Sequence, residues 1–168
     1  MPEIDQPYDC EYKGGIRNTY AFSTVYGLGY EVSFVPSSYL FDAYPQVEVE
    51  VFEMVISVVY NPTGEKMSTD PIVSPTIFAI FEDFFLPHSQ AIVYICDSSD
   101  GRESVRHRKF SVWFYSQTQQ TDILTKLDRG ITDGLQKIYI SLIMSRLHPQ
   151  FKEIAEIFAW LGEEDKIS

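Results

Sequence analysis

The chain has 168 residues, of which 45% are hydrophobic and 15% are aromatic. This length and composition predict one folded domain and exclude an intrinsically disordered protein. The 13 basic and 24 acidic side chains leave a net charge of −11. Electrostatic attraction of the whole chain to nucleic acid or to an anionic membrane is therefore excluded, unless a local basic patch supplies it.

The first residues and the two cysteines indicate the cell compartment. The chain does not begin with the basic and apolar pattern of a secretory signal, and no apolar run reaches the roughly 18 residues of a membrane span. Cys10 and Cys96 are too few and too differently placed for a disulfide framework or a zinc site. We therefore expect a cytoplasmic protein with two reduced thiols, no metal site and no membrane attachment.

Strands are predicted first along the chain. Alternating apolar residues at 20–24 and 30–34, separated by a glycine-containing turn at 27–29, predict a β-hairpin. Residues 47–60 first alternate and then become apolar on both faces, which predicts a long strand entering the middle of a sheet. Asn, Pro and Gly within residues 61–64 end that strand.

The clearest helix follows. Ser74 is placed to cap it, Pro75 suits its first turn, and Pro87 lies just beyond its end. Five apolar residues recur at helical spacing, namely Ile77, Ile80, Phe81, Phe84 and Phe85. Residues 91–96 are almost wholly apolar and predict an interior strand. Strand, helix and strand in this order predict a right-handed parallel crossover.

The next segment allows two interpretations. Asp100 and Glu103 have the spacing of a capping box, which favours a helix over residues 102–115. Residues 109–115 are also rich in aromatic and β-branched side chains, which is typical of a strand. We predict the helix because the cap signal decides between the two patterns.

Two strands and a helix complete the chain. Strands are predicted at residues 121–128 and 137–147, with a turn region at 130–134 between them. A last helix runs from Pro149 to Gly162, and apolar residues at helical spacing give it an inward face.

These elements predict a single α+β domain spanning residues 1–168. A mixed sheet of about six strands and three helices follow the order β-β-β-α-β-α-β-β-α. Residues 1–18 are expected to form a loose leader, residues 19–162 the globular core, and residues 163–168 an acidic tail.

One short basic segment interrupts the acidic chain. Residues 102–109 hold four cationic side chains, one histidine and a single acidic residue. The segment follows a predicted interior strand and opens a predicted helix, a position at which many sheets bind anions. The candidates for an anion site or a partner site are Asp97, Asp100, Arg102, Arg106 and Arg108. The same residues suit solvated ion pairs at the helix entry, so both interpretations stay open.

Other chemical groupings are weaker. Cys96 and His107 are residue types for a nucleophile and its base, but no third orienting group is evident. Asp97 and Asp100 carry oxygen ligands for Mg²⁺, yet no glycine-rich phosphate loop accompanies them. We therefore expect no catalytic residue and no cofactor.

Two resemblances add to this interpretation. The hairpin, the helix entry at residues 70–77 and the later charged and aromatic residues resemble a family of small bacterial proteins known only as a domain of unknown function. The later residues that carry the resemblance are Tyr94, Ile95, Cys96, Asp97, Asp100, Arg102, Arg106, Arg108, Phe110, Trp113 and Phe114. It implies a bacterial, cytosolic protein and brings no activity.

The order of elements is also similar to the acyl-CoA N-acyltransferase fold. That similarity implies a pyrophosphate-binding loop at residues 61–74 and a catalytic acid at Tyr115. The glycine-rich motif of that family is reduced here to Gly64.

We expect a non-enzymatic, cytosolic interaction or accessory protein whose partner is another protein. A bacterial regulatory, toxin–antitoxin or defence locus would suit such a protein. The alternative is a degenerate acyltransferase-like enzyme, or a binder of small anions that uses residues 97–109. Nucleic-acid binding by the basic segment is disfavoured by the negative charge around it. No sequence signal indicates the number of subunits.

Overall fold

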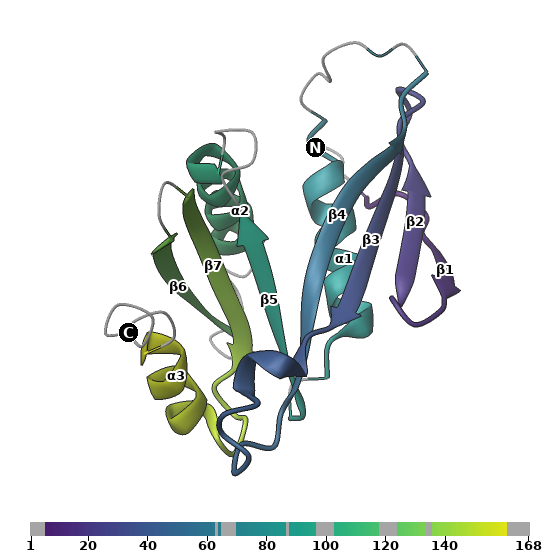
Figure 1. Cartoon of the computed structure of the whole chain (residues 1–168). Helices are drawn as coiled ribbons and strands as arrows, with labels where there is room; N and C mark the ends of the chain where they lie inside the picture. Colours follow the sequence, from purple (N-terminus) through teal and green to yellow (C-terminus); the bar gives the residue numbers. More distant parts are fainter. Residues whose placement is uncertain are drawn as a thin grey trace. The chain divides into compact units, whose positions relative to one another are not determined.

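The computed structural model describes residues 6–62, 64, 70–86, 88–96, 103–117, 124–133 and 136–160. Hydrogen-bonded strands form one mixed seven-stranded sheet in the order β1-β2-β3-β4-β5-β7-β6, with three α-helices (Figure 1). The elements are β1 (Glu11–Gly14), β2 (Thr19–Ser23), β3 (Gly29–Pro36), η1 (Ser38–Phe41), β4 (Glu50–Tyr60), α1 (Val73–Phe84), β5 (Gln90–Cys96), α2 (Glu103–Gln117), β6 (Leu124–Asp133), β7 (Gln136–Ser145) and α3 (Phe151–Trp160). The predicted α+β class is confirmed. None of the described helices is both long and apolar enough to cross a membrane.

The chain divides into two compact units. Unit 1 consists of Met1–Pro36 and Met54–Phe85, and unit 2 of Ser37–Glu53 and Leu86–Ser168. Strand β4 contributes residues to both, because the division falls between Glu53 and Met54.

Unit 1 contains an antiparallel meander of β1, β2 and β3 with α1 on one face. The period-2 pattern of β2 and β3 points Tyr20, Val32 and Phe34 toward α1, where all three are buried. The Phe34 and Phe84 rings stack 4.1 Å apart, and the Tyr20 hydroxyl donates a 2.7 Å hydrogen bond to Asp83 of α1. The predicted hairpin at residues 20–34 is therefore confirmed, and its alternate residues supply the core of this unit.

The seventh strand, β1, corrects the expectation that residues 1–18 are a loose leader. Glu11 and Tyr12 pair with Ala21 and Tyr20 of β2, and the two tyrosine rings lie 4.8 Å apart. Gly15 follows with a positive φ of 79°, which lets the chain turn back into β2 without strain. A strand forms here because β2 offers both a hydrogen-bonding edge and an aromatic contact.

The start of α1 differs from the prediction. Ser74 is not the cap; Ile72 occupies the N-cap position and makes no side-chain cap hydrogen bond. The Asp70 carboxylate instead accepts a 2.9 Å hydrogen bond from the Ile72 N–H group. The helix therefore begins at Val73, two residues earlier than a Ser74 cap predicts, and Ser74 lies in its first turn. Pro87 lies outside the described residues.

Unit 2 is built on β5, β7 and β6 together with the first residues of β4. Glu50 to Glu53 pair in parallel with Gln90 to Val93, which confirms the predicted parallel relation of these strands. Strand β7 pairs antiparallel with β5 on one side and with β6 on the other.

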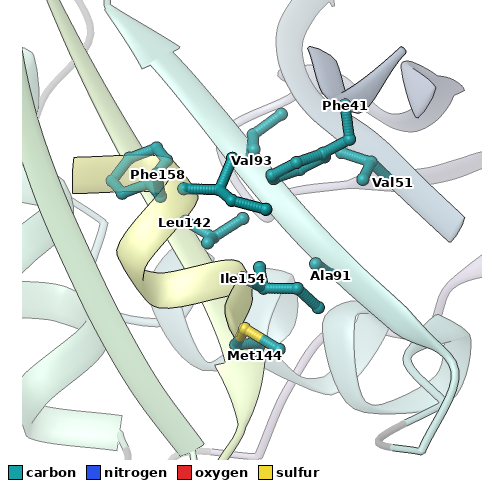
Figure 2. Packing of buried hydrophobic residues seen from close by; sticks show 9 residues of the cluster. Phe41, Val51, Ala91, Val93, Leu142, Met144, Ile154 and Phe158 are labelled. Carbon is teal, nitrogen blue, oxygen red and sulfur yellow. The ribbon is translucent and has the colours of Figure 1, made fainter. Parts of the chain in front are cut away.

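Helix α3 and the 3₁₀ turn η1 cover one face of these strands (Figures 1 and 2). The core on this face is made of alternate strand residues and the apolar stripe of α3, namely Phe41, Val51, Ala91, Val93, Leu142, Met144, Ile154, Ile157 and Phe158. Val47 and Val49, predicted as strand residues, precede β4 and pack against this core.

Helix α2 covers the opposite face of β5 and β7. The buried Phe110 and Phe114 point toward the sheet, and the ring of Phe110 lies 4.3 Å from that of Tyr94 on β5. The helical interpretation of this segment is confirmed, and the alternative strand is wrong. The aromatic residues that suggested a strand are the buried face of the helix.

The boundaries of β6 also differ from expectation. The strand begins at Leu124 and extends through Gly130 to Asp133, where a turn region was predicted. Gly130 is tolerated in the strand because it faces Tyr139, and a Cβ atom there would lie 3.6 Å from that ring. The cross-strand aromatic ring covers the glycine. The predicted end of α3 at Gly162 lies outside the described residues.

Candidate functional site

The predicted basic segment is described only in part. Asp97, Asp100 and Arg102 lie outside the described residues. Cys96 ends β5 and Arg106 lies in α2, but their side chains are likewise outside the description. Arg108 is exposed on α2. The ion pairs and the anion site predicted at this strand-to-helix entry both stay predictions.

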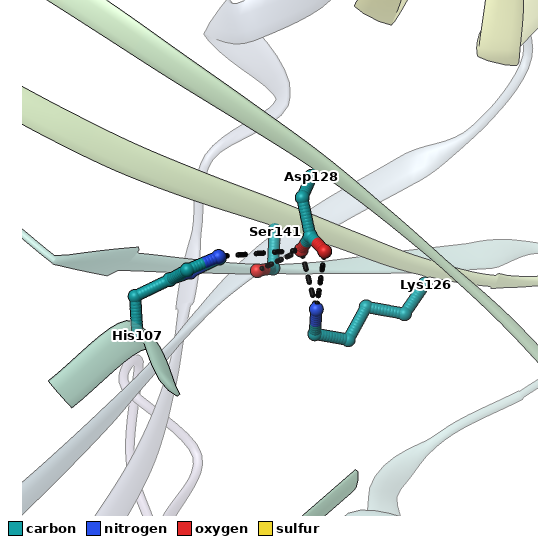
Figure 3. Close-up of polar contacts among 4 residues, drawn as sticks. All are labelled: His107, Lys126, Asp128 and Ser141. Carbon is teal, nitrogen blue, oxygen red and sulfur yellow. Dashed lines mark hydrogen bonds and ion pairs between the residues drawn. The ribbon is translucent and has the colours of Figure 1, made fainter. Parts of the chain in front are cut away.

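Among the candidates whose side chains are described, His107 is brought together with a group of polar side chains. Figure 3 shows it beside Lys126 and Asp128 of β6 and Ser141 of β7, a group that we call the Asp128 cluster. Lys126 and Asp128 are two residues apart on a strand and so share a face, and Asp128 pairs directly with Ser141 across the ladder. Helix α2 places His107 over that same face.

Asp128 is the centre of the cluster. Its carboxylate oxygens lie 2.5 and 2.6 Å from the Lys126 ammonium, and one of them accepts a 2.7 Å hydrogen bond from the Ser141 hydroxyl. The Nε2 atom of His107 lies 4.0 Å from the same carboxylate. The Lys126 side chain is fully buried, whereas that of Asp128 is 37% exposed. One half-exposed carboxylate therefore neutralises a buried ammonium, which would otherwise be strongly destabilising.

The surroundings of His107 disfavour its charged form. Burial lowers its pKa, Asp128 opposes this effect, and the nearby Lys126 ammonium adds to the lowering. Its ring stacks on Tyr139 at 4.8 Å, and its Nδ1 atom is buried with no hydrogen-bond partner among the described residues. Tyr115 is exposed on α2, with its ring centre 5.4 Å from the Lys126 ammonium.

Serine, histidine and aspartate are the residue types of a hydrolytic triad, but the hydrogen bonds that join them here differ from those of a triad. Ser141 donates to the aspartate rather than to a histidine, and it is completely buried. A nucleophilic serine needs an adjacent base and access to substrate. The arrangement suits charge neutralisation under α2 and not acyl transfer. Within the described part of the chain, no three His, Cys, Asp or Glu side chains gather to hold a metal ion.

Unit 1 carries a second feature, an open concavity of about 690 Å³. It lies where the segment before β1 passes β2, β3 and the end of β4. Four aromatic residues, three carboxylates and one lysine are among the residues that line it: Tyr8, Phe22, Tyr30, Tyr60, Asp9, Glu11, Glu31 and Lys13. We call it the acidic concavity.

Three of the aromatic residues around the concavity form a stack of rings. Phe22 lies between Tyr30, whose ring centre is 5.0 Å away and nearly parallel, and Tyr8, at 6.1 Å. Tyr8 fastens the N-terminal segment to the unit, because its hydroxyl donates a 2.7 Å hydrogen bond to Asp70 and its N–H group donates to the Thr76 hydroxyl at 2.9 Å. The position of Tyr8 in this stack is thus set by contacts between segments more than sixty residues apart.

Negative charge dominates the concavity. Three carboxylates oppose the single ammonium of Lys13, which lies 3.9 Å from Glu31. Burial, Asp9 and Asp83 all raise the pKa of the Cys10 thiol at the same wall. Burial and Asp70 likewise raise the pKa of Tyr30. Both pKa values shift in the same direction because burial, the larger cause, and neighbouring carboxylates each disfavour a negative charge on the group.

Sequence reasoning missed both features. The alternation at residues 11–13 followed by two glycines is the signal that, given more weight, would have indicated β1. Lys126 and Asp128 at strand spacing were a weaker sign of a shared face.

Fold and site together define an α+β protein with a neutralised buried lysine in unit 2 and an acidic concavity in unit 1. Residues 69–160 match a family described as a family of unknown function (DUF6169), and the chain belongs to that family. The resemblance to a family of unknown function is thereby confirmed, while the acyltransferase similarity stays a prediction. Comparison with curated proteins and with solved structures gave no match.

The matched residues contain the whole Asp128 cluster, whereas the residues that line the acidic concavity all precede them.

Proposed function

We propose that the protein is a non-enzymatic interaction protein of the bacterial cytoplasm, whose acidic concavity receives a basic segment of a protein partner. The observation that carries this proposal is an open concavity lined by three carboxylates and four aromatic residues, of which Tyr60 is 61% exposed. The concavity precedes the residues matched by the family, so the proposal concerns this chain and not every member.

The chemistry of the lining suits a lysine or arginine side chain. A cation held over an aromatic face gains about 0.5–1 kcal/mol at an exposed site, and carboxylates at the rim add charge-assisted hydrogen bonds. Tyr60 is 61% exposed and Tyr30 half-buried, so both are accessible to an incoming cation. Glu11 and Asp9 are exposed beside them.

Exposed apolar residues at the concavity and in the nearby β2–β3 turn suit a polypeptide better than a free cation. Val59 lines the concavity beside Tyr60 and is 56% exposed. Val25 and Tyr26 are 76% and 61% exposed in the β2–β3 turn, and the N–H group of Val25 donates to the Tyr8 hydroxyl at 3.4 Å. Apolar and aromatic contacts around charged anchors are typical of protein interfaces. The net charge of −11 would also accelerate encounter with a basic partner.

The proposal is tested with a labelled arginine-rich peptide as the probe. Asp9→Asn with Glu11→Gln removes two charges at the concavity, and Asp42→Asn with Glu156→Gln removes two exposed charges in unit 2 as the matched control. We expect the first double variant to bind the peptide about tenfold more weakly at low salt, equal to about 1.4 kcal/mol, and the control to bind nearly as the wild type.

Tyr60→Ser tests the aromatic contribution, since its ring is exposed and its loss leaves the net charge unchanged. We expect Tyr60→Ser to bind the peptide more weakly than the wild type does, and this loss of affinity to persist at higher salt. Equal weakening in the two charge variants would show that the peptide responds to net charge alone, and would contradict a site at the concavity.

A further inference from the structure

The two edge strands of the sheet differ in how they are protected against pairing. An edge strand presents unpaired N–H and C=O groups, and natural edges are usually short, bulged or charged. At one edge, β1 has four residues, an irregular register between Tyr12 and Gly14, and exposed charges at Glu11 and Lys13. This edge carries the usual protection.

The other edge strand, β6, lacks most of the features that protect an edge strand against pairing. It has 10 residues, contains no proline and pairs with β7 in an unbroken register from Leu124 to Asp133. Among the described residues, no strand pairs with its outer side. A long, regular edge of this kind is a template for another strand.

Lys126 is an inward-pointing charge on β6, and its partner removes the protection that such a charge gives. An inward-pointing charge normally blocks strand addition, because the added strand would bury that charge unpaired. Here Asp128 lies two residues further along the same face. An antiparallel second copy of β6 centred on Leu127 places its Asp128 directly opposite Lys126, and its Lys126 opposite Asp128. Opposite charges in directly facing positions stabilise a strand pair.

The neighbouring registers are unfavourable. Facing residues of an antiparallel pair point to the same face, so a two-fold axis between identical strands passes through a residue. An axis through Lys126, Asp128 or Arg129 places two like charges opposite each other, whereas an axis through Leu127 places two leucines there. Leu127 is partly buried against the core beneath α3, so this contact would extend an apolar surface.

We propose that the outer edge of β6 is a homodimer interface, in which two copies of β6 pair antiparallel about Leu127 and exchange the Lys126–Asp128 ion pair between subunits. The partner is a second copy of this chain, because the strand is complementary to itself in that register. This interface lies in unit 2, and its existence does not depend on the acidic concavity.

Cysteine crosslinking tests the register in a background that carries Cys10→Ser and Cys96→Ser. Leu127→Cys places two sulfur-bearing residues face to face, with Cα atoms about 4.5–5.5 Å apart, within the range of a disulfide. Arg129→Cys is the matched control, because its Cα atoms would lie more than about 13 Å apart. We expect an intersubunit disulfide in the first variant and none in the second or in the background.

Two further measurements keep the proposal falsifiable if Leu127→Cys folds poorly. Thr125 faces Arg129 in this register, so Thr125→Cys with Arg129→Cys should crosslink between subunits although neither single variant does. Light scattering of the wild type over about a hundredfold range of concentration should show a dimer. A monomer throughout would overturn the interface, and so would a dimer in which neither the Leu127 variant nor the double variant crosslinks.

Discussion

Removing the Asp128 carboxylate should destabilise unit 2 far more than removing the lysine that it neutralises. Asp128→Ala leaves the fully buried Lys126 ammonium without its anion and the Ser141 hydroxyl without its acceptor. Loss of one partner from a buried ion pair typically costs about 3–5 kcal/mol. Because the Asp128 side chain is 37% exposed, water can reach the vacated position, and we expect about 2–3 kcal/mol.

The reciprocal change is expected to be mild. Lys126→Met removes the buried charge and keeps most of the side-chain volume. The Asp128 carboxylate then retains its hydrogen bond from Ser141 and its contact with water. We expect a loss of less than about 1 kcal/mol, since replacing a buried charge by a packed apolar group is often nearly neutral. The double variant should recover most of the stability lost in Asp128→Ala.

Urea unfolding followed by tryptophan fluorescence measures this asymmetry. Both tryptophans, Trp113 and Trp160, lie in unit 2 with the cluster, so the signal reports the relevant unit. With a slope of about 2 kcal/mol per molar urea, the midpoint should fall by about 1–1.5 M in Asp128→Ala and by less than about 0.5 M in Lys126→Met. Measurements at two protein concentrations separate unfolding from dissociation of a dimer.

Similar losses in the two single variants, or a larger loss in Lys126→Met, would refute this reasoning. Either result would mean that the ammonium reaches water when its partner is removed, and that the cluster does not neutralise a buried charge.

Three further predictions concern other contacts. The pKa values of His107 and His148 are lowered by burial, so below about pH 6.5 the unfolded chain binds more protons than the folded chain. The free energy of unfolding of unit 2 should therefore decrease as the pH falls. This decrease should be smaller in His148→Asn, and an unchanged dependence on pH in that variant would argue against burial of a neutral ring. Gly29→Ala places a Cβ atom 3.0 Å from that of Tyr60. We expect the free energy of unfolding to fall by about 1 kcal/mol and the arginine-rich peptide to bind more weakly. Wild-type values for both would contradict the close approach. Tyr20→Phe removes the 2.7 Å hydrogen bond to α1, and circular dichroism should show a melting temperature lower by about 2–4 °C, against no change if the hydroxyl is solvated.

Local patterns in the sequence predicted most of the regular elements. Helix α1 and the β2–β3 hairpin follow from apolar spacing and glycine position, and they form with nearly the predicted limits. The capping signal before Glu103 correctly favoured a helix over a strand for the segment that includes Phe110 and Phe114. In each case the deciding information lies within one or two turns of chain, where sequence spacing and spatial distance correspond.

The tertiary structure alone decided which polar groups meet. His107 and Ser141 both approach Asp128, although they lie 21 and 13 residues from it along the chain, and only the packing of α2 and the register of β6 against β7 bring them together. Tyr8 forms a wall of the acidic concavity because Asp70 and Thr76 hold it, 62 and 68 residues away.

The sequence by itself therefore determined the α+β class, most of the elements and the acidic character of the protein. It did not determine which carboxylates line an open concavity, nor that a buried lysine and its aspartate lie on an edge strand. Those properties depend on long-range strand pairing and helix packing, whose contacts join residues with no fixed spacing in the chain.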